Sequence, residues 1–87
     1  AQPSVSFNYC YKAALLDDLS AFNKVSCCYH MAFGVSRDDK VAFEWLTKAE
    51  SIGKENVPTE VLFNLGHCYY SGSAVACDFP KAVHYFT

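Results

Sequence analysis

An internal repeat limits the fold of this chain more than any other feature. When residues 21–47 are laid over residues 61–87, six of the 27 aligned positions are identical: Cys28/Cys68, Tyr29/Tyr69, Val35/Val75, Asp38/Asp78, Ala42/Ala82 and Thr47/Thr87. Unrelated sequences would share about one or two positions over this length. A repeat of this period predicts a stack of similar small units.

A second overlay, at an offset of 36, extends the repeat toward the N-terminus. It matches Val5, Phe7, Lys12 and Ala13 with Val41, Phe43, Lys48 and Ala49. We therefore predict the second helix of a preceding repeat in residues 1–19, a complete repeat in 20–57 and a truncated repeat in 58–87. Because repeat arrays need about three or more units, we expect these residues to be a portion of a longer array.

Each unit has the hydrophobic period of two helices. In the complete repeat, apolar residues at i, i+4, i+7, i+8 and i+11 form one stripe: Ala21, Val25, Cys28, Tyr29 and Ala32. The next unit repeats that stripe from residue 61 to residue 72. These patterns predict an all-α chain of about five helices, over residues 3–16, 20–32, 38–52, 58–71 and 78–87.

Residues suited to helix ends lie at the predicted boundaries. Asp38 and Asp78 stand where an N-cap is needed. Gly53 is expected to take the left-handed conformation that ends a helix, with Asp17 at the equivalent position. Three prolines fall in predicted first turns: Pro3, Pro58 and Pro80.

Small residues on the predicted helix faces indicate close packing within each unit. Gly66 is expected to meet the paired helix, and Ser26 takes its place in the earlier unit. Ala42 and Ala82 are expected to permit the same close approach from the opposite helix. A hairpin with this pattern cannot bury its apolar face alone, so it must stack on its neighbours.

The combined motif resembles the Sel-1-like repeat. In the last unit it comprises Leu65-Gly66-His67-Cys68-Tyr69-Tyr70-Ser71-Gly72, Val75, Asp78, Lys81-Ala82 and Tyr85-Phe86. In the middle unit it comprises Gly34-Val35, Asp38, Ala42, Trp45, Lys48-Ala49 and Gly53. The resemblance implies a right-handed α-solenoid of antiparallel helical hairpins, related to tetratricopeptide repeats. Four residues depart from the motif: Ser26, Ala32 and Ala74 replace glycines, and Val41 replaces a lysine.

Composition and charge exclude several function classes. With 52% hydrophobic and 16% aromatic residues, the chain is too apolar to be disordered. A net charge of −2 argues against binding to nucleic acid, which needs a basic face. No apolar run approaches the roughly 20 residues of a membrane-spanning helix. The acidic pairs at 17–18 and 38–39 lie at predicted helix ends, and no glycine-rich phosphate loop is present, so we predict no enzyme activity.

The resemblance also implies a binding surface. In this geometry the first helix of each unit lines the concave face. We predict that a partner protein or peptide, or a neighbouring repeat, binds the positions that the core stripe leaves free: Asn23, Cys27, His30, Met31, Phe63, His67, Tyr70 and Ser71. Phe63 and Tyr70 have an alternative interpretation, in which they pack against the neighbouring repeat.

The cysteines indicate free thiols. Their number is odd and no Cys-x-x-Cys pair occurs among Cys10, Cys27, Cys28, Cys68 and Cys77. We expect burial of the thiols at 28 and 68, exposure of the thiol at 77, and a reducing compartment, with the cytoplasm favoured and the mitochondrion as the alternative.

We therefore predict a non-enzymatic adaptor or scaffold with no cofactor or metal. One alternative is a mitochondrial assembly factor that binds metal or haem, for which Cys27, His30 and His67 could converge on one ion. Another is a regulatory segment attached to a catalytic domain elsewhere in the full-length chain. The resemblance does not choose among the roles that family members have as adaptors.

Overall fold

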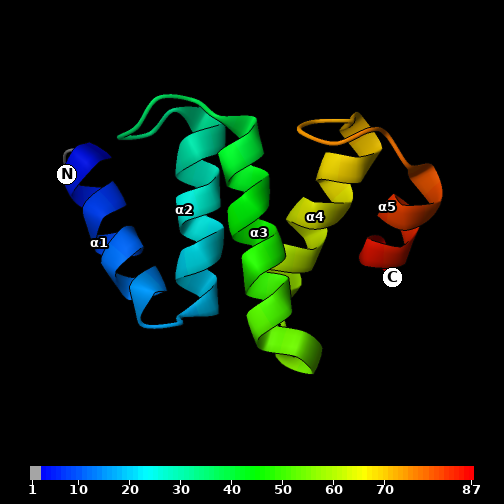
Figure 1. The fold of residues 1–87 in the computed structure, drawn as a ribbon, viewed down its shortest axis with the longest axis horizontal. Helices are drawn as coiled ribbons and strands as arrows, with labels where there is room; N and C mark the ends of the chain where they lie inside the picture. Colours follow the sequence, from blue (N-terminus) through cyan, green and yellow to red (C-terminus); the bar gives the residue numbers. More distant parts are fainter. Residues whose placement is uncertain (1–2) are drawn as a thin grey trace.

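The computed structural model describes residues 3–87, and the regular elements in this range are all helices, with no strand. Successive helices run in alternating directions (Figure 1). Each helix begins and ends within one residue of its predicted bounds, and a short 3₁₀ turn follows α3. The elements are α1 (Pro3–Leu15), α2 (Leu19–Met31), α3 (Asp39–Gly53), η1 (Lys54–Asn56), α4 (Thr59–Ser71) and α5 (Phe79–Phe86).

Aspartates begin three of the helices. The Asp38 carboxylate accepts a hydrogen bond from the Val41 amide, and the Asp78 carboxylate accepts one from the Lys81 amide, both at 3.1 Å. Asp18 caps α2 in a similar way. Each cap supplies a partner for an amide that the helix leaves free, so the predicted caps at 38 and 78 are confirmed.

The prediction for Gly53 is wrong in one respect. Gly53 has a right-handed φ of −76°, and the left-handed residue is Lys54, at φ 53°. A Cβ at Gly53 would stand 2.7 Å from Leu19 Cδ1, so the glycine permits close packing of α3 rather than ending the helix. Asp17, at φ 63°, does have the expected left-handed conformation.

The core runs through two helical hairpins, which we call the first hairpin (α2–α3) and the second hairpin (α4–α5). The largest fully buried side chains are Val25, Val61 and Leu65. In the first hairpin the buried Ser26 hydroxyl donates to the Ala42 carbonyl at 2.8 Å. In the second, a Cβ at Gly66 would stand 2.7 Å from Phe86 Cε1, so the predicted close approach is confirmed.

The contact between α1 and α2 is repeated between α3 and α4. The rings of Phe7 in α1 and Tyr29 in α2 meet edge to face at 5.6 Å, and those of Phe43 in α3 and Tyr69 in α4 meet the same way at 5.8 Å. α1 therefore contacts α2 as α3 contacts α4. The division into repeats at residues 1–19, 20–57 and 58–87 stays a prediction. Within residues 3–87 no helix is long and apolar enough to cross a membrane.

Candidate functional site

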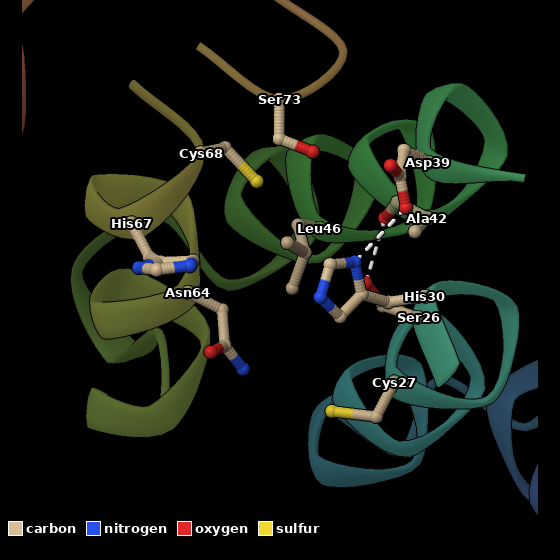
Figure 2. Close-up of a pocket in the computed structure, with 10 residues that line it drawn as sticks. All are labelled: Ser26, Cys27, His30, Asp39, Ala42, Leu46, Asn64, His67, Cys68 and Ser73. Atoms are coloured by element: carbon tan, nitrogen blue, oxygen red, sulfur yellow. Dashed lines mark hydrogen bonds and ion pairs between the residues drawn. The ribbon is translucent and has the colours of Figure 1, made fainter. Parts of the chain in front are cut away.

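A pocket of about 50 Å³ lies where α2, α3 and α4 meet (Figure 2). Its volume suits a few water molecules or the end of a small side chain. Figure 2 shows side chains of α2 and α4 on opposite sides, with α3 behind them. The lining residues are Ser26, Cys27, His30, Asp39, Ala42, Leu46, Asn64, His67, Cys68 and Ser73.

Three of the predicted partner-binding residues line this pocket. Cys27 and His30 come from α2 and His67 comes from α4. Both histidines are exposed, whereas Cys27 is half-buried. The structure thus brings together residues about 40 positions apart, as the repeat predicts, and adds Asn64 and Cys68, which lay outside the predicted set.

Asn23 is buried between α2 and α4. Its side chain is only 7% exposed, and its Oδ1 accepts a hydrogen bond from Asn64 Nδ2 at 2.6 Å. The pair links α2 to α4, because α4 covers the part of α2 where Asn23 lies. Asn23 therefore holds the two helices together: of the predicted partners it contacts the neighbouring repeat, and its burial leaves it inaccessible to a separate protein or peptide.

Phe63 and Tyr70 lie away from the pocket, against α5. The ring of Phe63 is 5.5 Å from that of Phe86, and the ring of Tyr70 is 5.5 Å from that of Phe79. Both residues are still 59% exposed. The predicted strip is therefore divided between the pocket and the surface of the second hairpin.

The two remaining predicted residues lie at the ends of their helices. Met31 is 72% exposed at the end of α2. Ser71 is exposed at the end of α4, where its hydroxyl donates to the His67 carbonyl at 2.8 Å. Neither residue lines the pocket, although both are accessible to a partner.

A charged cluster borders the pocket on the α3 side. Asp39 Oδ1 lies 2.9 Å from His30 Nδ1, and Asp39 Oδ2 accepts from Arg37 Nη2 at 3.0 Å. The hydrogen bond from Arg37, with a further contribution from His30, lowers the pKa of Asp39. Asp39 is the first residue of α3, so it also lies at the helix end that the sequence predicts for it. The carboxylate of Asp38 caps α3, so a second carboxylate next to it, that of Asp39, is not needed as a cap. This extra carboxylate is the sequence signal that could have revealed the cluster.

The two thiols of the pocket are poor nucleophiles. Burial raises the pKa of Cys27, with a smaller effect of Glu60, and burial likewise raises the pKa of Cys68, with a smaller effect of Asp39. Both thiols are therefore protonated at neutral pH, and the thiolate is the reactive form. Cys68 is half-buried rather than buried as predicted, because it borders the pocket.

The environments predicted for Cys28 and Cys77 are confirmed. Cys28 is buried and Cys77 is exposed. Among residues 3–87, no three histidine, cysteine, aspartate or glutamate side chains are arranged to hold a metal ion. Cys27, His30 and His67 thus share a pocket without forming the ligand set of the metal alternative.

The sequence and the fold both match known proteins. Residues 20–53 and 59–87 match the sequence model of the Sel1 repeat. The crystal structure of a Sel1 repeat protein from Oxalobacter formigenes superposes with a TM-score of 0.84 and 25% sequence identity. The match covers 95% of this chain and 60% of the length of that protein. A search of curated proteins found no match. This α-solenoid chain therefore belongs to the Sel1 repeat family, whose members are generally modules for protein–protein interaction.

Proposed function

We propose that this chain is a non-catalytic adaptor or scaffold segment that binds a partner protein or peptide on the face shared by α2 and α4. The observation that carries the proposal is the pocket between these helices, in which His30 and His67 stand exposed on opposite sides (Figure 2). Exposed imidazoles and an amide beside a small apolar hollow suit a peptide, because they combine hydrogen-bonding groups with a place for a side chain.

The chemistry of the pocket favours binding over catalysis. The raised pKa values of Cys27 and Cys68 leave the pocket thiols protonated. The carboxylate of Asp39 is already occupied by Arg37 and His30. These features support an interaction surface, in agreement with the general role of Sel1 repeats.

The test is affinity capture from lysate with the full-length protein, read by mass spectrometry. The double variant His30→Ala/His67→Ala removes both exposed imidazoles of the pocket. His84→Ala is the matched control, because His84 is an exposed histidine of α5 outside the pocket. We expect partners to be lost with the double variant and retained with the control. Retention with both variants, at unchanged helical content, would move the binding surface away from this pocket.

A further inference from the structure

The pocket between α2 and α4 contains a histidine whose hydrogen-bonding pattern is fixed by its neighbour. His30 Nδ1 lies 2.9 Å from Asp39 Oδ1. The hydrogen bond from Arg37, and then the one from His30, lowers the pKa of Asp39. Asp39 is therefore a carboxylate at neutral pH and can only accept hydrogen bonds, so Nδ1 of His30 is the donor. In the uncharged ring the other nitrogen, Nε2, is then an acceptor.

Nε2 of His30 faces the hollow of the pocket. Figure 2 shows this nitrogen directed toward the space between α2 and α4, and one ring nitrogen of His67 directed into the same space from the opposite side. His67 takes part in neither of the ion pairs found among residues 3–87, so its ring can adopt either uncharged tautomer. The two imidazoles can thus offer an acceptor on one side of the hollow and a donor on the other.

The surroundings of the two imidazoles favour an uncharged ligand. Ala42 and Leu46 of α3 are buried side chains that line the pocket, and a charge placed against them would lose hydration free energy. Asp39 would repel a carboxylate. Arg37 already neutralises Asp39, since its Nη2 lies 3.0 Å from Oδ2, so no unpaired negative charge is left to attract a cation. The ligand is therefore neutral and carries both a donor and an acceptor.

We propose that the pocket binds the carboxamide of an asparagine or glutamine side chain of the partner. The amide N–H donates to Nε2 of His30, and the amide carbonyl accepts from the ring of His67. The inference rests on the proposed function, because it names the side chain that the partner inserts into the same site. A carboxamide has its donor and its acceptor on separate atoms, so it can reach both sides of the hollow, whereas a hydroxyl group has them on one atom.

The same geometry makes this recognition depend on pH. Imidazoles change charge between about pH 5 and pH 8. A protonated His30 has a hydrogen on Nε2, so it can no longer accept from the carboxamide, whereas a protonated His67 can still donate to it. Asp39 stays ionised over this range because its pKa is lowered, and the pocket thiols stay protonated because their pKa values are raised. The titratable residues around His30 are Arg37 and Asp39 on the α3 side, Cys27 on α2, and His67, Cys68 and, near Cys27, Glu60 on α4.

The test uses small molecules of similar shape that differ in hydrogen bonding. Acetamide donates and accepts, acetone only accepts, and 2-propanol carries a single hydroxyl group. The intact protein, labelled with ¹⁵N at histidine, is titrated with each, and the NMR shifts of His30 and His67 report binding, with His84 outside the pocket as internal control. At about pH 8 we expect acetamide to bind about threefold or more tighter than acetone. Equal affinities, no saturable shifts with acetamide, or tighter binding of 2-propanol would overturn the proposal.

A second titration at lower pH tests the role of Nε2. At about pH 5.5 the protonated ring of His30 offers no acceptor, so acetamide and acetone should bind about equally. A preference for acetamide that does not change between the two pH values would contradict the proposed hydrogen bond.

Asp39→Asn tests whether Asp39 is a positioning residue that acts through the ring of His30. Asp38 accepts the capping hydrogen bond of α3, so the fold should survive, as circular dichroism would verify. We expect the ¹⁵N shifts of the His30 ring to show loss of the Nδ1–H form, and the preference for acetamide to disappear. Asp17→Asn is the matched control, because Asp17 is exposed outside the pocket in a left-handed conformation that asparagine tolerates. A wild-type His30 protonated at Nε2 alone, or equal effects of both variants, would overturn the inference.

The outcome can be told apart from that of the lysate capture. If the His30→Ala/His67→Ala variant loses its partners while the wild type shows no preference for acetamide, the partner uses another group and only this inference fails. If acetamide is preferred but the same variant retains every partner, the proposed function fails, and with it the assignment of the carboxamide to a partner.

Discussion

The first and second hairpins share a backbone framework but differ in the side chains placed on it. The amides of Asp38 and Asp78 donate to the carbonyls of Tyr29 and Tyr69 at 3.0 and 2.9 Å, so both interhelical loops close in the same way. In contrast, Leu46 of α3 is 2% exposed and its counterpart Phe86 of α5 is 45% exposed. The comparison shows that the repeat preserves the helix caps and the loop closure, whereas the burial of Leu46 depends on the helix that follows its hairpin, since Leu46 lies in the buried cluster with Leu65 of α4.

The loops themselves show how one backbone tolerates different residues. Each loop has two left-handed residues, at positions 32 and 34 in the first hairpin and at 72 and 74 in the second. Glycine occupies only one of the two in each loop, and not the equivalent one: Gly34 in the first and Gly72 in the second. Alanine occupies the other position of each pair, where its Cβ is strained.

The largest expected effect comes from replacing the loop glycines. A Cβ at Gly34 would stand 2.5 Å from the Pro3 carbonyl oxygen, whereas a Cβ at Gly72 would find its nearest neighbour, Cys77 Cβ, at 3.5 Å. Both replacements strain a left-handed residue by about 1 kcal/mol. Only Gly34→Ala must also displace α1, so we expect it to lower the free energy of unfolding by about 2–4 kcal/mol.

Urea denaturation followed by circular dichroism measures this difference. Gly72→Ala is the control and should lower the free energy of unfolding by about 1 kcal/mol. If both alanine variants lost the same stability, the backbone contact between Gly34 and Pro3 would have no energetic role.

A smaller effect is expected where the hairpins differ in polarity. Asn64→Leu would leave the buried amide of Asn23 without its partner, at a cost of about 1–3 kcal/mol. Asn23→Leu/Asn64→Leu removes both amides and imitates the apolar Phe63 of the second hairpin, so most of that loss should be recovered. A double-mutant cycle of unfolding free energies measures the coupling. Additive losses would show that the hydrogen bond contributes little.

The helices and their caps could be predicted from the sequence because their determinants are local. Asp38 and Asp78 cap residues three positions later, and the apolar period fixes which face of each helix is buried. The pocket was partly predictable for the same reason. The repeat places Cys27 and His67 at equivalent positions of α2 and α4, and His30 lies one turn after Cys27. The sequence does not fix how far α4 is rotated against α2.

That rotation explains the burial of Asn23. It pairs Asn64 with Asn23, which are 41 positions apart rather than 40. Phe63 and Tyr70 were misplaced for a separate reason, because they lie on the side of α4 that faces its own hairpin partner, α5. The 3₁₀ turn after α3 was missed because its sequence, Lys54-Glu55-Asn56, has no strong local signal.

The smallest expected effect is a gain in stability from the strained alanines. Ala32 and Ala74 are exposed and have φ values of 56° and 67°. Glycine adopts this conformation without a Cβ clash, although it also increases the entropy of the unfolded chain. The relief of strain exceeds the entropic loss, so Ala32→Gly and Ala74→Gly should each raise the free energy of unfolding by about 0.5–1 kcal/mol.

Ala76→Gly separates conformational strain from a general effect of glycine. Ala76 is an exposed residue of the same loop as Ala74, and its φ is not positive. Its replacement should therefore lower stability by a few tenths of a kcal/mol, about the entropic cost alone. If Ala74→Gly also lowered stability while Ala32→Gly raised it, the left-handed residues of the two loops would not be energetically equivalent. The shared framework would then extend to the hydrogen bonds of the loops but not to their backbone strain.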